Sequence, residues 1–127
     1  MALTATVTCL VLIEYLAFGM LVGKARMDTG VRAPAISGNA LFERWFRVHQ
    51  NTMEQLVVFL PALWIFATFV HELTAAGLGL IFFIGRIIYC RSYVRDPESR
   101  GPGFMLSALP NIILVLGGII GAFVHLF

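Results

Sequence analysis

Four long apolar runs constrain this chain of 127 residues more than any other feature. Each is about 20 residues or longer, the length that a helix needs to cross a hydrocarbon core of roughly 30 Å. Lipid offers backbone groups no hydrogen-bond partners, so a spanning segment has to be helical or part of a closed barrel. The period-two alternation of a barrel strand is absent. The predicted helices cover about residues 4–22, 41–70, 73–92 and 104–126.

The composition indicates the same class of protein. Hydrophobic residues make up 59% of the chain and charged residues only 13%, which is too apolar for a soluble domain of this length. We therefore predict an all-α integral membrane protein, a four-helix bundle of two hairpins in one domain that covers residues 1–127. The first run lacks the basic start and the small-residue cleavage site of a signal peptide, so we expect it to remain in the mature protein.

Basic side chains are unevenly distributed among the loops. The second loop offers only His71 and Glu72, and neither end of the chain carries Lys or Arg. The positive-inside rule therefore places the first and third loops in the cytosol and both termini on the far side of the membrane. That membrane is either a bacterial inner membrane or the endoplasmic reticulum. The basic residues in and near these two loops are Lys24, Arg26, Arg32, Arg44, Arg47, Arg91, Arg95 and Arg100.

Turn-forming residues mark the predicted loops. Gly and Pro are frequent in residues 23–40, and residues 91–103 contain an Asp-Pro pair and a Gly-Pro-Gly run. Asn39 is a suitable N-cap for the second helix. That helix is about 30 residues long, which exceeds the thickness of the membrane, so its first turns should extend into the cytosolic headgroup region.

Polar side chains form one stripe on each of two predicted helices. The stripes follow offsets of 0, 3, 7 and 10 on helix 41–70, and of 0, 3 and 7 on helix 73–92. Because the two helices run in opposite directions, both stripes lie in the cytosolic half of the bilayer. Ionisable groups at this depth are costly and usually face a bundle interior or an aqueous cavity. The stripe residues are Arg44, Arg47, Asn51 and Glu54 on the first of these helices and Arg86, Tyr89 and Tyr93 on the second.

The two stripes suit a small ligand that carries carboxylates and an amine. Guanidinium groups grip carboxylates bidentately, Glu54 can accept an ammonium, and Asn51 and the tyrosines add neutral hydrogen bonds. Glutathione has this chemistry, and an arginine beside its thiol would lower the thiol pKa by stabilising the reactive thiolate. A purely structural alternative stays open, in which Arg47 pairs with Glu54, or Arg86 with Glu14, to set the helix register.

At these residues the chain resembles the family of membrane-associated proteins in eicosanoid and glutathione metabolism (MAPEG). Residues 42–54 match the pattern F-E-R-x-x-R-x-[HQ]-x-N-x-x-E in full. Residues 85–93 match G-R-x-x-Y-x-x-x-Y, and Arg100 follows seven residues later, as in the family. With the four helices and the basic loops, the resemblance covers nearly the whole chain.

The resemblance implies a homotrimer with a glutathione site between neighbouring subunits, open to the cytosol. Prostaglandin E synthase-like members have His, Ser and Tyr where this chain has Tyr89, Gly101 and Phe104, so the chain is more similar to the microsomal glutathione transferase and leukotriene-synthase branch. The matching positions assign glutathione binding to Arg26, Arg47, Asn51, Glu54, Tyr89 and Tyr93, and the catalytic stabilisation of the thiolate to Arg100.

The expected function is therefore that of a glutathione transferase, with possible peroxidase activity, acting on hydrophobic electrophiles that arrive from the membrane lipids. No second His or Cys lies at ligand spacing from His49, so no metal is expected, and neither is a nucleic-acid partner. Two alternatives remain. One is a small four-helix multidrug exchanger that couples transport to protons through Glu14, and the other is a non-catalytic lipid-binding membrane protein.

Overall fold

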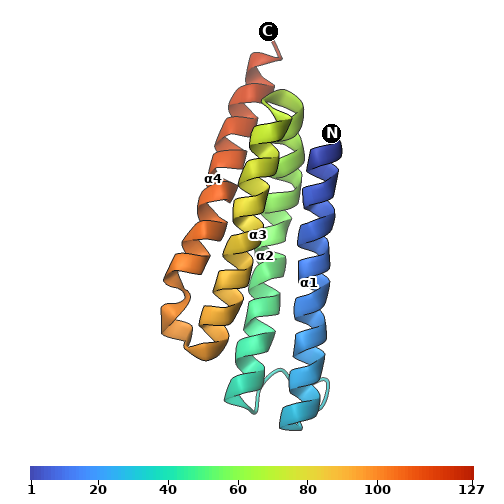
Figure 1. Cartoon of the computed structure of the whole chain (residues 1–127), viewed down its shortest axis with the longest axis vertical. Helices are drawn as coiled ribbons and strands as arrows, with labels where there is room; N and C mark the ends of the chain where they lie inside the picture. Colours follow the sequence, from blue (N-terminus) through green and yellow to red (C-terminus); the bar gives the residue numbers. More distant parts are fainter.

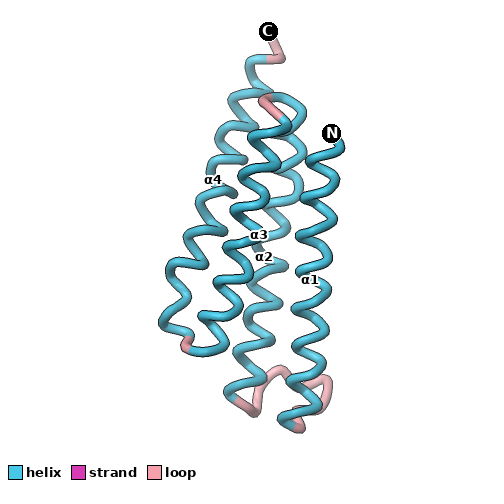
Figure 2. Tube along the Cα trace, viewed as in Figure 1, coloured by secondary structure: helices cyan, strands magenta, loops and turns pink.

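A computed structural model describes all residues from Met1 to Phe127 and consists of four long helices (Figure 1). Neighbouring helices run in opposite directions, so both termini lie at the same end of the bundle as the α2–α3 connection. Figure 2 shows that the rest of the chain is short loops, without any strand. The helices are α1 (Ala2–Thr29), α2 (Ala40–Phe69), α3 (Glu72–Arg95) and α4 (Gly101–Val124), and a short 3-10 helix, η1 (Pro97–Arg100), precedes α4.

Each of the four long helices is apolar enough to cross a membrane. Their most apolar windows have mean hydropathies between 1.5 and 2.1. Large hydrophobic side chains also cover much of the outside of the bundle, which is the surface that lipid would contact. The prediction of an all-α membrane bundle of four helices is confirmed.

The first helix is longer than predicted. It continues to Thr29 instead of ending at about residue 22. An ion pair of 2.6 Å between Lys24 and Asp28, one turn apart, stabilises the added segment. Gly30 then ends the helix with a φ of 74°, in the left-handed region that favours glycine. Lys24 and Arg26 therefore lie on a helix and not in a loop.

The fourth helix also begins earlier than predicted, at Gly101 instead of about residue 104. Gly101 has helical dihedral angles, with φ at −51° and ψ at −55°. Pro102 occupies the first turn, where its missing N–H breaks no helical hydrogen bond. The Gly-Pro-Gly run therefore starts a helix here, although its composition predicts a turn.

The predicted cap of the second helix is confirmed. The side chain of Asn39 accepts a hydrogen bond of 3.1 Å from the backbone N–H of Phe42, and α2 begins at Ala40. The helix has 30 residues. In Figure 1, α1 and α2 extend beyond the α3–α4 connection at the end away from the termini.

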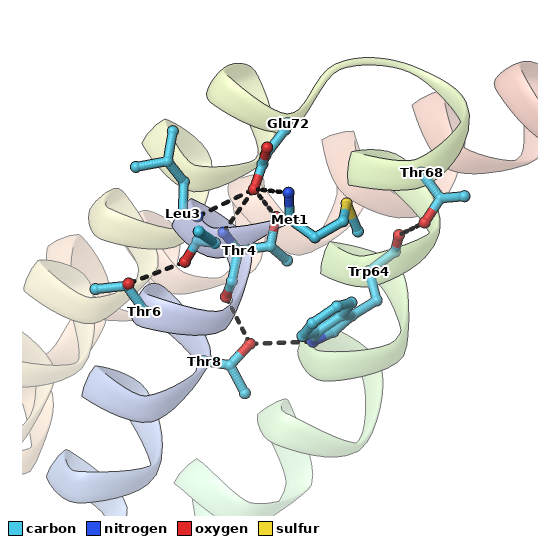
Figure 3. A network of polar contacts seen from close by, with 9 residues as sticks. Met1, Leu3, Thr4, Thr6, Thr8, Trp64, Thr68 and Glu72 are labelled. Atoms are coloured by element: carbon cyan, nitrogen blue, oxygen red, sulfur yellow. Dashed lines mark hydrogen bonds and ion pairs between the residues drawn. The ribbon is translucent and has the colours of Figure 1, made fainter.

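A carboxylate fastens α1 to α3 at the end where the termini lie (Figure 3). Glu72 Oε1 accepts hydrogen bonds from the backbone N–H groups of Leu3, at 3.0 Å, and Thr4, at 3.3 Å, and lies 2.7 Å from the Met1 amino nitrogen. A negative group at these unpaired N–H groups suits a helix N-terminus. Trp64 of α2 donates a further hydrogen bond of 3.0 Å to the Thr8 hydroxyl of α1.

A buried polar layer lies between two of the three apolar clusters that form the core of the bundle. On α1, Glu14 lies between Val11 of the larger cluster and Phe18 of the smaller one. The other helices follow the same order, since Thr52 and Arg86 also separate residues of the two clusters along α2 and α3. The members of this layer are Glu14, Asn51, Thr52, Arg86 and Ser107, which are all buried.

Candidate glutathione site

Arg86 is the centre of the polar layer and is fully buried. Its guanidinium donates hydrogen bonds of 2.8 Å to Asn51 Oδ1 and 2.9 Å to Thr52 Oγ1, both on α2. A longer bond of 3.4 Å reaches the Ser107 hydroxyl on α4. One side chain of α3 therefore fixes polar groups on two neighbouring helices, and the two stripes predicted from the sequence meet at it.

Tyr89 lies one turn beyond Arg86, on the same face of α3. The Arg86 guanidinium carbon is 4.2 Å from the centre of the Tyr89 ring, which is a cation–π contact. Tyr93 follows after another turn, and the two tyrosine rings stack with their centres 5.5 Å apart. Gly103 of α4 packs against the backbone of Tyr89, where a Cβ atom would lie 2.6 Å from the Tyr89 Cα. These contacts hold Tyr89 in one orientation.

Arg47 and Glu54 form an ion pair of 3.2 Å on the outside of α2. The pairing that the sequence left open as a structural alternative is thus present for these two residues. Their side chains are 45% and 46% exposed, so both charges remain accessible to another molecule. Asn51 lies between them in the sequence but turns inward, and only 7% of it is exposed.

Arg44 belongs to the predicted stripe but has a structural contact. Its guanidinium donates to the backbone carbonyl oxygens of Val94, at 3.1 Å, and Arg95, at 3.2 Å. These carbonyls belong to the last turn of α3, where no further helical N–H group is available to bind them. Arg44 therefore caps α3 from α2.

The two predicted loop arginines make local contacts. Arg100 donates to the Pro97 carbonyl oxygen at 2.9 Å and lines an open cavity of about 450 Å³ with Glu98, Gly101 and Phe104. Arg26 donates to the Ala35 carbonyl oxygen at 2.7 Å, and its guanidinium lies 4.6 Å from the centre of the Phe42 ring. No hydrogen bond or ion pair within the chain joins either arginine to another predicted site residue.

An apolar groove between α2 and α4 lies away from this polar region. Val57, Pro61 and Ile65 line it from α2, and Leu114 and Gly118 line it from α4. These residues lie in the second halves of α2 and α4, toward the end of the bundle with the α2–α3 connection, whereas η1, which contains Arg100, lies between α3 and α4 at the opposite end (Figure 1). The groove is therefore separate from the candidate site.

Three contributions to the site were missed by the sequence analysis. Thr52 lies inside the matched motif, yet its hydroxyl was not singled out. Ser107 was passed over, although it and Asn111, one turn later, are the only polar side chains of α4. Gly103 was interpreted as a turn residue, but it is a place where α4 packs directly against the backbone of α3.

Glu14 lacks the direct ion pair with Arg86 that the structural alternative predicted. It is buried, with 6% of the residue exposed, and neither carboxylate oxygen has a hydrogen-bond partner. Both residues nonetheless belong to the polar layer, Glu14 on α1 and Arg86 on α3.

Comparison with known proteins identifies the family to which this chain belongs. A family model described as the MAPEG family matches residues 3–120. Microsomal glutathione S-transferase 2 of Homo sapiens is 35% identical over 119 residues, covering 94% of this chain and 81% of the relative. Leukotriene C4 synthase of Rattus norvegicus is 36% identical over 124 residues, covering 98% and 83%. An uncharacterized protein of Synechocystis sp. is 44% identical over 116 residues, covering 91% and 85%. The chain therefore belongs to the MAPEG family of membrane proteins.

Proposed function

We propose that this protein is a membrane-bound glutathione transferase, which activates the glutathione thiolate for attack on hydrophobic electrophiles from the bilayer. The observation that carries the proposal is the exposed Arg47–Glu54 pair beside Asn51. It offers a cation and an anion, close together and accessible, to a ligand that has carboxylates and an amine. The names of two relatives, a glutathione transferase and leukotriene C4 synthase, support the same chemistry.

Each predicted residue has a role that its contacts allow. Arg47 would grip a glutathione carboxylate, and Glu54 would accept the ammonium group. Asn51 uses its side-chain oxygen to bind Arg86, which leaves its amide N–H groups to donate to the tripeptide. Tyr89 and Tyr93 would add hydroxyl groups, and Arg26 would supply a second cation for a carboxylate.

Arg100 would hold the sulfur as a thiolate. Its guanidinium is exposed at the edge of an open cavity, where a thiol can approach it. The thiolate then donates an electron pair to the electrophilic carbon, a C–S bond forms, and the bond to the leaving group breaks. With a hydroperoxide, two glutathione molecules would instead be oxidised to the disulfide while the peroxide is reduced to an alcohol and water.

The exposure of Arg47 and Glu54 also supports an assembly. They lie on a helix that crosses the membrane, where charges facing lipid are costly. A neighbouring copy of the chain would cover these two side chains and bring its own Arg26 and Arg100 to the site. We therefore propose a homotrimer with sites between subunits, which cross-linking in native membranes would test by the size of the largest cross-linked species.

The sidedness of the bundle is part of the same proposal. The basic first and third loops lie at one end of the bundle and the termini at the other. The positive-inside rule places the basic end, and hence Arg26 and Arg100, in the cytosol. A cysteine introduced at Ser37, in the first loop, should react with a membrane-impermeant thiol reagent only from the cytosolic side.

An ultraviolet difference spectrum of the purified protein titrated with glutathione tests the chemistry directly. We expect a saturable thiolate band in the wild-type protein. Arg100→Ala should lose this band, whereas Arg95→Ala, a nearby exposed arginine, should keep it. If the wild-type protein shows neither a band nor binding, the transferase function is rejected. If Arg100→Ala keeps the band, only the role of Arg100 is rejected.

A further inference from the structure

Glu14 and Arg86 are the only two residues of charged type that the bundle buries. They come from α1 and α3, and both lie in the polar layer between the two apolar clusters. The remaining buried polar residues are of uncharged type, so Glu14 is the single acidic side chain inside the bundle that could balance Arg86. A buried guanidinium without a counter-charge is strongly destabilising.

The unpartnered atoms of the layer belong to these same two side chains. Both carboxylate oxygens of Glu14 and the Nε atom of Arg86 are buried without a hydrogen-bond partner. The other two guanidinium nitrogens of Arg86 are occupied by Asn51, Thr52 and Ser107. Nε and the second N–H of Nη1 are therefore the donors that remain for an acidic partner such as Glu14.

We propose that Glu14 is the counterion of Arg86 and, through Arg86, a positioning residue for the glutathione site. The inference rests on the proposed function, because the groups that Arg86 positions are Asn51 and Tyr89. Arg86 binds Asn51 Oδ1 at 2.8 Å and lies 4.2 Å from the Tyr89 ring. Glu14 itself touches neither residue and would not contact glutathione.

The physical reason is that a buried guanidinium without an acidic partner can interact only with neutral oxygens or with water. Without Glu14, the buried charge of Arg86 is balanced by neutral oxygens alone, and the side chain gains by moving toward water. A guanidinium that moved in this way would lose its hydrogen bond to Asn51 and its contact with the Tyr89 ring. Glu14 holds the guanidinium in the layer by charge attraction from the α1 side.

A double-mutant cycle on the full-length protein in lipid nanodiscs tests the counterion. The variants are Glu14→Gln, Arg86→Gln and the double variant, with Asp28→Asn as an exposed carboxylate-to-amide control. Thermal unfolding is measured for each. We expect the double variant to lose less stability than the sum of the losses of the two single variants, because only the single variants leave one buried charge unpaired. If the stability losses of the two single variants simply add up in the double variant, Glu14 is not the counterion of Arg86. The same conclusion follows if Glu14→Gln and the double variant both fail to fold.

Glutathione binding tests the positioning role separately. Glu14→Gln should raise the glutathione Kd about tenfold, with the KM of the electrophile at saturating glutathione changed by less than about twofold. The double variant should recover stability but not glutathione affinity, since Asn51 and Tyr89 still lack Arg86. An unchanged Kd in Glu14→Gln would overturn the positioning role. If the wild-type protein does not bind glutathione, both the proposed function and the positioning role are rejected. The stability cycle needs no glutathione, so it still tests whether Glu14 and Arg86 form an ion pair.

Discussion

Arg86 of α3 donates a hydrogen bond of 2.8 Å to Asn51 of α2, and the arginine is wholly buried and the asparagine nearly so. This bond joins the two polar stripes, which are 35 residues apart in the sequence. Because each guanidinium N–H points in a fixed direction, the bond also sets the rotation of α2 relative to α3. The orientation of the Asn51 side chain therefore depends on how α2 packs against α3, and not on α2 alone.

Replacing Arg86 by lysine should destabilise the protein even though the charge is kept. An ammonium group cannot reproduce the planar fork that reaches Asn51, Thr52 and Ser107 together. We expect a loss of about 2–3 kcal/mol for the unpaired oxygens, seen as a lower unfolding temperature in detergent. Arg91→Lys, at an exposed position, should stay within about 0.5 kcal/mol of the wild-type protein. Equal losses in the two variants would show that the fork does not matter.

Alanine at Gly103 should disturb the candidate site, while alanine at Gly77 of α3 should not. A Cβ at Gly103 would lie 2.6 Å from the Tyr89 Cα, so α4 has to move away from α3. At Gly77 nothing lies within 4 Å of an added Cβ, and alanine favours a helix over glycine by about 1 kcal/mol. We expect Gly103→Ala to lower both the unfolding temperature and the glutathione affinity, and Gly77→Ala to leave the affinity unchanged. Calorimetric titration with glutathione checks both, and equal affinities would contradict the packing argument.

Breaking the Arg47–Glu54 pair should affect binding far more than stability. An exposed ion pair contributes at most about 1 kcal/mol, so Arg47→Gln and Glu54→Gln should unfold within a few degrees of the wild-type protein. Each should weaken glutathione binding at least about tenfold, because each removes a charge complementary to the ligand. Asp28→Asn breaks the exposed Lys24–Asp28 pair and serves as the control with unchanged affinity. If Arg47→Gln binds glutathione as tightly as the wild-type protein, the pair is only structural.

Removing the charge of Glu72 should loosen the start of α1. Its Oε1 atom accepts from the backbone N–H groups of Leu3 and Thr4, which no helical carbonyl can serve (Figure 3). Glu72→Gln should speed hydrogen exchange at these amides, because a neutral amide oxygen is a weaker acceptor than a carboxylate. Glu43→Gln, an exposed residue of α2, should not change their exchange. Exchange at Leu3 and Thr4 that is the same in both variants would show that α1 is held by its apolar contacts alone.

Local signals accounted for the parts of the site that lie on a single helix. The offset of seven residues between Arg47 and Glu54 is two helical turns, so their ion pair follows from the period of α2 alone. The same holds for the cap by Asn39, which needs only a backbone N–H three residues later. Helical spacing alone does not predict the contact of Arg44. This residue belongs to the same stripe of α2, but its guanidinium binds a backbone carbonyl at the end of α3.

The sequence by itself determined the number of helices, their alternating direction and the end of the bundle where the arginines gather. Long apolar runs can satisfy their backbone in lipid only as helices, and short loops return each helix beside the one before it. Tertiary structure alone decided that Arg86 binds Asn51, that Ser107 and Gly103 of α4 complete its surroundings, and that Glu14 is buried in the same layer. Helical periodicity places side chains on faces of their own helix, but the rotation of each helix against its neighbours is set by how all four pack together.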